Sequence, residues 1–335
     1  MVSETSNQRT GWRSGVAGAG RLGRTALGRI GVDIGGGREQ RDDPRVLLDG
    51  AFLRQVEALH FNVSRSATAG LSGEHASRRR AHSIEFADHR SYVAGDDFRL
   101  IDWNVYARLG ELCLKLTEAH ENISVHLLLD CSASMDWGRP NKLLYARRVA
   151  AALGAVALAG YDTVHIGAFG DGLQATFPPL RGRGSVGLMI EHLRGLTPSP
   201  RTDLARAAAG YCEASGRRGL AVLLTDFLVP SGYGEALHYL ARAGLQTTAL
   251  HVIDEQEESP GLDGLLELLD CETGELVKVS TSPKLLRRYA EYVQSWSDEL
   301  AQACHRNRAG YVRVPTRVPP QTLVLQTLRR EGLLR

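Results

Sequence analysis

Short runs of apolar residues alternate with longer helical patterns in the chain after Asn122. An apolar run of four to eight residues is typical of a strand that is buried on both faces, and a longer segment between two such runs predicts a helix. Strands that alternate with helices in this way pair in parallel through right-handed crossovers. The pattern therefore predicts a doubly wound α/β fold with a mostly parallel, Rossmann-like sheet. The expected strands are 124–129, 163–169, 173–177, 220–224 and 246–253, and the expected helices are 142–159, 185–196, 203–215 and 233–243.

The segment after Asp254 adds further elements of both kinds. Turn residues predict a hairpin, and a proline at the first helical position predicts where the next helix starts. We expect these elements to complete the same sheet. They are a hairpin around 271–274, a helix at 283–305, a strand at 311–314 and a final helix at 319–333.

The first part of the chain has weaker patterns. Residues 1–44 are rich in Gly and Arg and bury too little apolar surface to offset the entropy of ordering, so they predict a disordered tail. The stretch Gly18–Gly23 matches the dinucleotide fingerprint G-x-G-x-x-G, but no apolar strand leads into it, which favours a flexible linker. Apolar positions behind Asp49 predict an amphipathic helix at 47–59. We expect a tail (1–44), an N-terminal module (45–120) and an α/β domain (121–335).

Composition and charge exclude several classes of protein. An apolar content of 43% in 335 residues can bury one sizeable core, which excludes collagen-like, coiled-coil and wholly disordered chains. Forty basic and thirty-eight acidic residues give a formal charge of +2, so nucleic acid is not the expected partner. The longest apolar stretch of low charge, 149–160, is shorter than the roughly twenty residues of a membrane span, so it predicts a buried helix and no membrane anchor. Five cysteines without C-x-x-C spacing favour the cytoplasm.

Side chains with oxygen ligands follow two of the expected strands. Asp130, Ser132 and Ser134 come directly after the first strand at alternate positions, and Asp226 follows the strand at 220–224. Thr202 precedes the helix at 203–215. Ligands of doubly wound sheets bind beyond the carboxyl ends of the strands, where these residues are expected to converge. The sequence therefore predicts one site built from Asp130, Ser132, Ser134, Thr202 and Asp226.

The residue types in this set point to a hard cation. Two carboxylates and three hydroxyls suit an octahedral Mg²⁺ or Mn²⁺ and disfavour Zn²⁺, and at least one coordination position is left for water or for a carboxylate of a partner. The alternatives are structural: Asp130 as a helix cap, the two serines as turn residues, and Thr202 as the N-cap of the helix that starts at Asp203. Cys131 lies inside the loop and is expected to point toward the core.

This pattern resembles the metal-ion-dependent adhesion site (MIDAS) of von Willebrand factor type A domains. That site has the sequence Asp-x-Ser-x-Ser followed by a distant Thr and a distant Asp, and all five elements occur here in order. The resemblance implies that the two serines and Thr202 contact the metal and that Asp130 and Asp226 bind it directly or through water. It also implies that an acidic residue of the ligand takes the open position.

A second resemblance covers residues 50–320. The signature Gly-Asp-Asp-x-Arg-x-Ile-Asp-Trp at residues 95–103 looks like the bacterial family known as domain of unknown function 58. Many relatives have N-terminal membrane helices, which this chain lacks, and the family is associated with MoxR-type AAA+ ATPases. The resemblance thus implies such a partner and a role in assembling or activating other complexes. The candidate residues for an interaction or inter-module contact are Asp96, Asp97, Arg99, Asp102 and Trp103.

The charged signature has three interpretations, of which a second metal site in its aspartates is not supported by their ligand spacing. Its aspartates and arginines can form an ion-pair network at the junction of the two modules, which is the reading we favour, or an exposed recognition surface.

Signals for catalysis are few. No phosphate-binding G-x-x-x-x-G-K-[ST], zinc-protease H-E-x-x-H or hydrolase G-x-S-x-G motif occurs, and Ser132 stands where a haloacid-dehalogenase phosphatase needs its second Asp. The favoured hypothesis is a non-enzymatic, metal-dependent protein-interaction module. The alternatives are a Mg²⁺-dependent hydrolase that uses the same loop, and a structural domain with a degenerate site.

Overall fold

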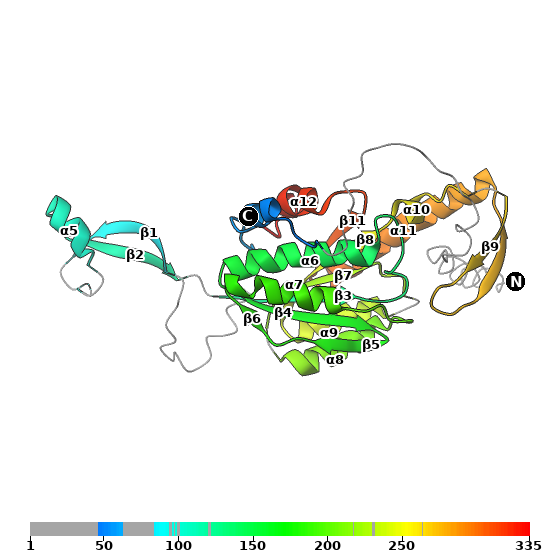
Figure 1. Cartoon of the computed structure of the whole chain (residues 1–335), viewed down its shortest axis with the longest axis horizontal. Coiled ribbons are helices and arrows are strands. Elements are labelled where there is room, and N and C mark those ends of the chain that lie inside the picture. Colours follow the sequence, from blue (N-terminus) through cyan, green and yellow to red (C-terminus); the bar gives the residue numbers. More distant parts are fainter. Residues whose placement is uncertain are drawn as a thin grey trace, which may run out of the picture. The chain divides into compact units, whose positions relative to one another are not determined.

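A computed structural model gives the three-dimensional structure of the chain (Figure 1). It describes residues 46–62, 84–93, 96, 98, 101–119, 122–216, 218–229, 232–262 and 264–335. The predicted tail at 1–44 lies outside the described residues. The chain divides into two compact units, one formed by residues 123–335 with the segment up to residue 67 and the other by residues 68–122.

A seven-stranded sheet forms the centre of the first unit. Its strands are β3 (Ser124–Asp130), β4 (Thr163–Gly170), β5 (Gly172–Thr176), β6 (Leu180–Arg181), β7 (Gly219–Thr225), β8 (Leu245–Ile253) and β11 (Gly310–Pro315). Five of them run parallel in the order β11-β8-β7-β3-β4, and β5 and β6 pair antiparallel with β4. The first strand of this sheet in the sequence, β3, lies in its interior, and later strands are added on both sides of it. The predicted doubly wound α/β fold is therefore confirmed.

Helices cover both faces of this sheet (Figure 1). One face carries α3 (Gly50–Val56), α6 (Lys142–Ala159) and α7 (Val186–Gly195), and the other carries α8 (Leu204–Ser215), α9 (Tyr233–Arg242) and α11 (Pro283–Arg306). Successive side chains of a strand point to opposite faces. Leu127 and Leu129 of β3 accordingly join the first core, and Leu128 joins the second.

Helix α6 is buried on nearly all sides. Asn141 caps it by accepting a hydrogen bond from the backbone N–H of Leu144 at 2.9 Å, and its Ala- and Leu-rich sequence has high helix propensity. A Cβ at Gly154 would lie 2.2 Å from the Sδ of Met189, so glycine lets α7 pack closely. The apolar stretch at 149–160 is thus a buried helix, as predicted. The N-terminus of α6 follows the loop that leaves β3.

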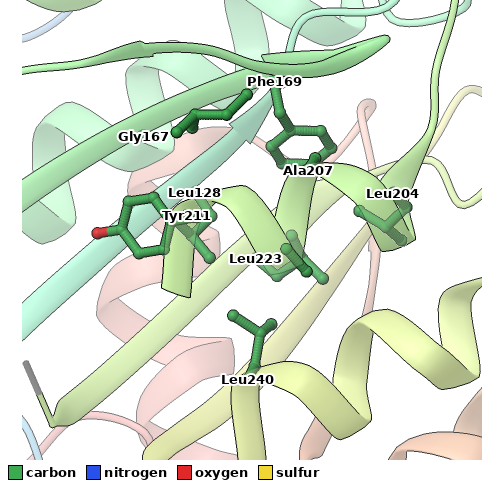
Figure 2. Close-up of a pocket in the computed structure, with 10 residues that line it drawn as sticks. Leu128, Gly167, Phe169, Leu204, Ala207, Tyr211, Leu223 and Leu240 are labelled. Carbon is green, nitrogen blue, oxygen red and sulfur yellow. The ribbon is translucent and has the colours of Figure 1, made fainter. Parts of the chain in front are cut away.

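The second core is packed closely around α8. It contains a void of about 10 Å³, roughly the space of one water molecule, whose walls are apolar (Figure 2). Tyr211 of α8, Gly167 of β4 and Leu128 of β3 line it. The hydroxyl of Tyr211 hydrogen-bonds to Nδ1 of His126 at 2.8 Å, which fixes the position of the ring.

The predicted domain boundary at residue 45 differs from the structure. Helix α3 forms behind Asp49, as expected, but its buried residues Phe52 and Val56 belong to the core of the sheet unit. Phe61 also pairs with Leu334 at the other end of the chain. The second unit starts at residue 68 because apolar burial ties the segment before it to the α/β domain.

The hairpin after β8 does not complete the central sheet, contrary to expectation. Strands β9 (Leu265–Leu269) and β10 (Leu276–Ser280) form a separate two-stranded sheet. Leu265 and Leu276 are largely exposed, at 79% and 64%, whereas Leu268 is buried, so the apolar pattern of these strands reflects burial only in part. Of the predicted C-terminal strands, β11 alone joins the central sheet.

The final predicted helix is present but irregular. It consists of α12 (Pro320–Thr322), a π-helical turn η4 (Leu323–Thr327) and α13 (Leu328–Arg330). Its apolar side chains Leu323, Val324 and Leu328 belong to the same core as α6. No helix in the described part of the chain is long and apolar enough to span a bilayer.

The second unit is small. Strands β1 (Ile84–Ser91) and β2 (Cys113–Ala119) pair antiparallel, and α5 (Trp103–Leu109) lies between them in the chain. Asp102 caps α5 by accepting hydrogen bonds from the backbone N–H groups of Asn104 and Val105.

Replacing Gly167 by alanine should destabilise the first unit. The new Cβ would lie 2.7 Å from the ring of Tyr211 and 3.0 Å from Leu128. Because the Tyr211 ring is fixed, we expect overpacking to lower the free energy of unfolding by about 1–3 kcal/mol in urea denaturation. Gly187→Ala on α7 is the matched control, since nothing lies within 4 Å of its new Cβ. Equal effects of the two substitutions would contradict this account of the packing.

Candidate metal centre

The Asp130 carboxylate organises the loop after β3. The side chain is fully buried. Its Oδ1 accepts a hydrogen bond from the backbone N–H of Ser132 at 2.8 Å, and its Oδ2 accepts one from the hydroxyl of Thr225 at 2.6 Å. Thr225 is the last residue of β7. The carboxylate therefore joins the carboxyl ends of two neighbouring strands.

Two serine hydroxyls continue the network from Asp130. The Oγ atoms of Ser132 and Ser134 lie 2.9 Å apart, and the Ser134 side chain acts to lower the pKa of the neighbouring Asp226 carboxylate. All of these side chains are at most 2% exposed. The structure thus brings four of the five predicted site residues into one buried cluster of oxygen atoms.

Asp226 has a partner that the sequence did not predict. Its Oδ1 accepts a hydrogen bond from the backbone N–H of Leu228 at 3.0 Å, and its Oδ2 accepts one from the ammonium of Lys142 at 2.8 Å. Lys142 is the first residue of α6, and its side chain is fully buried. The candidate metal centre therefore contains a built-in cation.

A third carboxylate balances that ammonium. Glu257 lies on the short helix α10 (Glu255–Glu258), and its Oε1 is 2.5 Å from Nζ of Lys142. Its Oε2 accepts a hydrogen bond from the backbone N–H of Asp254 in a capping box, which fixes the carboxylate. When Asp130, Asp226, Glu257 and Lys142 are all ionised, the cluster has a formal charge of −2, which equals the charge of one divalent cation in magnitude.

Thr202 lies near this edge of the sheet but is bonded to another group. Its hydroxyl donates a hydrogen bond to Glu272, in the turn between β9 and β10, at 3.2 Å. Its loop is attached to the site, because the backbone N–H of Ser199 donates to the carbonyl of Cys131. Asp203, and not Thr202, caps α8. The structure thus rules out the cap role considered for Thr202, and its role as a metal ligand stays a prediction.

Burial and charge shift the ionisation of these groups. Burial, and then the nearby charge of Asp226, raise the pKa of Asp130 to about 7. Burial also acts to raise the pKa of Asp226, but the ammonium of Lys142 outweighs it and the pKa falls below its ordinary value. Burial alone would lower the pKa of Lys142, yet its two carboxylate partners raise it. Asp226 and Lys142 therefore form a stable ion pair beside a carboxyl group that ionises near neutral pH.

Cys131 points into the core, as predicted, and is fully buried. Burial raises the pKa of its thiol to about 12. Because a thiolate is needed for nucleophilic or redox chemistry, Cys131 is a packing residue of the loop.

Three of the candidate interaction residues of the second unit lie in the described part of the chain, and they contact residues nearby in the sequence. Asp102 caps α5, and the Oδ2 of Asp96 accepts a hydrogen bond from the backbone N–H of Val93. Trp103 is 59% exposed and packs edge to face against Tyr106. Asp97 and Arg99 lie outside the described residues. The ion-pair network between the two modules stays a prediction.

Comparison with known sequences identifies relatives. The family described as "Protein of unknown function DUF58" matches residues 88–299. The uncharacterized protein Mb1516 of Mycobacterium bovis is 30% identical over 278 residues, which covers 81% of this chain and 82% of the relative. The uncharacterized protein Rv1480 of Mycobacterium tuberculosis has the same identity and coverage.

Comparison with solved structures gives similarity at low sequence identity. BatB from Bacteroides thetaiotaomicron is 18% identical, with a TM-score of 0.40, over 63% of this chain and 99% of that chain. Proximal thread matrix protein 1 from the mussel byssus, solved with a zinc-occupied MIDAS motif, is 14% identical, with a TM-score of 0.39, over 63% of this chain and 47% of that chain.

The stability of the metal-free protein should depend on the ionisation of Asp130. Between the model-peptide value of 3.8 and the folded value of about 7, the native protein keeps a proton that the unfolded chain has lost. Stability therefore falls as pH rises through this window and then levels off. The comparison is between wild type and Asp130→Asn in EDTA. The free energy of unfolding of wild type minus that of the variant should decline by a few kcal/mol over this range. One unit of pKa corresponds to about 1.4 kcal/mol.

Urea denaturation at closely spaced pH values measures this difference. Saturating Mg²⁺ should reduce the decline, because a bound cation favours the ionised carboxylate. A difference that stays constant with pH would show that Asp130 is not the titrating group.

Proposed function

We propose that this chain, a member of the family described as "Protein of unknown function DUF58", is a non-enzymatic protein-interaction module. Its interactions depend on a divalent cation. The observation that supports this function is the buried cluster formed by Asp130, Ser132, Ser134 and Asp226 at the carboxyl ends of β3 and β7. The described residues contain no group of three or more His, Cys, Asp or Glu side chains that fits a metal ion. Hydroxyl oxygens must therefore complete the ligand set, as a hard cation allows.

The spacing of the serine hydroxyls fits Mg²⁺. In an octahedral shell with bonds of about 2.0–2.1 Å, adjacent ligand oxygens lie about 2.8–3.0 Å apart. The Oγ atoms of Ser132 and Ser134 are 2.9 Å apart. They fit two adjacent positions of a Mg²⁺ shell without rearrangement, and Mn²⁺ is the closest substitute for such an experiment.

Thr202 is a suitable further ligand because of its bond to Glu272. A hydroxyl that donates its proton to a carboxylate keeps both oxygen lone pairs for other partners. The Thr202–Glu272 contact therefore positions the hydroxyl in the manner of an outer-shell hydrogen bond to a metal ligand.

The proposed ligand of the metal is a carboxylate of a partner protein. The resemblance to adhesion-type sites implies that an Asp or Glu of the partner fills the open coordination position. Family context makes a MoxR-type AAA+ ATPase the partner to test, with the assembly or activation of other complexes as the outcome. The five cysteines are free thiols, which is consistent with the reducing cytoplasm that we propose as its location.

The geometry does not support a hydrolase that uses Asp130 as its nucleophile. A nucleophilic Asp130 needs an accessible oxygen, but this side chain is fully buried and both of its carboxylate oxygens accept hydrogen bonds from the protein. The same contacts suit a residue that organises a metal loop.

Ser132→Ala should weaken metal binding at least tenfold. The substitution removes one of the two hydroxyls whose spacing fits the metal shell, and one hydrogen bond of the cluster. Isothermal titration calorimetry with Mn²⁺ measures the affinity. Ser297→Ala is the matched control, because Ser297 is also buried but lies on α11 and bonds to the carbonyl of Val293.

Capture of a co-expressed MoxR-type ATPase should require Mg²⁺ and should be lost with EDTA and with Ser132→Ala. Metal binding by Ser132→Ala at wild-type affinity would refute the proposed site. Capture that persists in EDTA would refute the metal-dependent interaction.

Glu272→Ala should weaken Mn²⁺ binding about tenfold, the lower end of the effect that loss of an outer-shell partner has on metal affinity. The substitution frees the Thr202 hydroxyl to rotate away. Glu275→Ala, in the same turn but exposed, is the charge-matched control in the titration. If both variants bind like wild type, Thr202 is not a ligand, although the four-residue cluster can still hold the ion.

A further inference from the structure

Lys142 is an unusual component for a cation-binding site. A buried ammonium is costly unless it is paired, and this one contacts two buried carboxylates, Asp226 at 2.8 Å and Glu257 at 2.5 Å. Nζ also lies 5.9 Å from the centroid of the Trp137 ring. The lysine thus has a fixed position next to a proposed metal ligand.

The ammonium and a divalent cation would interact with the same carboxylate. In the metal-free protein, Lys142 supplies the positive charge that the buried Asp226 needs. A divalent ion held by Asp130 and the serines would draw on Asp226 from the other side, so the two cations repel each other across that carboxylate.

Glu257 provides Lys142 with a second partner when the metal arrives. The capping box fixes the Glu257 carboxylate independently of Asp226. The ammonium can therefore stay paired while Asp226 turns toward the metal. Without Glu257, Lys142 would have Asp226 as its one carboxylate partner among the described contacts, and it would hold that carboxylate against the metal.

We infer that Lys142 and Glu257 set the metal affinity of the site with opposite signs: Lys142 lowers the affinity by competing for Asp226, and Glu257 raises it by giving the ammonium another partner. This inference rests on the proposed metal site. Neither residue needs to touch the ion, so both are positioning residues. They act through Asp226 and through the total charge of the cluster.

The inference predicts an order of affinities that follows formal charge. With its three carboxylates and its ammonium all ionised, the wild-type cluster has a charge of −2. Lys142→Met changes this charge to −3 and should bind Mn²⁺ at least about tenfold more tightly, whereas Glu257→Gln changes it to −1 and should bind at least about tenfold more weakly. The double variant restores −2 and should bind within a few fold of wild type.

The experiment is Mn²⁺ titration calorimetry on the full chain, with thermal unfolding in EDTA and in Mn²⁺ as the second readout. Lys142→Met leaves two buried carboxylates without their cation, so it should be less stable than wild type in EDTA and should gain more from Mn²⁺. The double variant keeps the inference testable if Lys142→Met does not fold, because it can be compared directly with Glu257→Gln.

Glu258→Gln is the matched control. It makes the same charge change on the same short helix, but Glu258 pairs with Arg313 and Arg317 and not with Lys142. Its Mn²⁺ affinity should equal that of wild type.

A purely structural role for the pair would give a different result. Both single variants would then lose stability, and their metal affinities would change in the same direction or not at all, which would overturn the inference while leaving the metal site intact. If wild type binds no Mn²⁺, or if Asp130→Ala binds as well as wild type, the proposed function itself fails.

Discussion

The rest of the site depends on one hydrogen bond, from the hydroxyl of Thr225 to the buried carboxylate of Asp130. It joins the carboxyl ends of β7 and β3, which are neighbours in the sheet although 95 residues separate the two side chains. With Asp130 held on that side, its other oxygen accepts the N–H of Ser132 and gives the loop its turn. The serine hydroxyls and Asp226 then meet because the sheet register places their loops together.

Much of the fold could be predicted from the chain, since buried strands and an Ala-rich buried helix leave patterns that depend on local sequence. The predictions were wrong where burial depends on the rest of the molecule. Leu265 of β9 and Leu276 of β10 are apolar but largely exposed, and the hairpin that carries them stays outside the central sheet. Helix α3 was assigned to the wrong part, because nothing near Phe52 indicates that the helix packs against α6 and η4, which lie far along the chain.

Four site residues could be predicted because strand ends bring alternate polar positions together at one edge. Lys142 and Glu257 could not, since each lies at the first turn of a helix, where a charged side chain is normally exposed. Their one common signal is position: each lies in the first turn of the helix that follows a strand of the central sheet, β3 for Lys142 and β8 for Glu257. A search of the sequence for every charged residue that follows a strand end, and not only for oxygen ligands, would have found both Lys142 and Glu257.

At the proposed metal site, the buried lysine would also separate folding from metal binding. A site made of buried carboxylates alone repels itself without its ion, so that metal binding and folding become one event. Here the ammonium of Lys142 compensates Asp226, and the pKa of Asp130, raised by burial and by Asp226, lets that group accept a proton near neutral pH. The ammonium of Lys142 and the proton on Asp130 allow the loop to keep its hydrogen bonds without a divalent cation. An interaction module gains from this arrangement, because the ion can enter or leave without unfolding the surface that a partner binds.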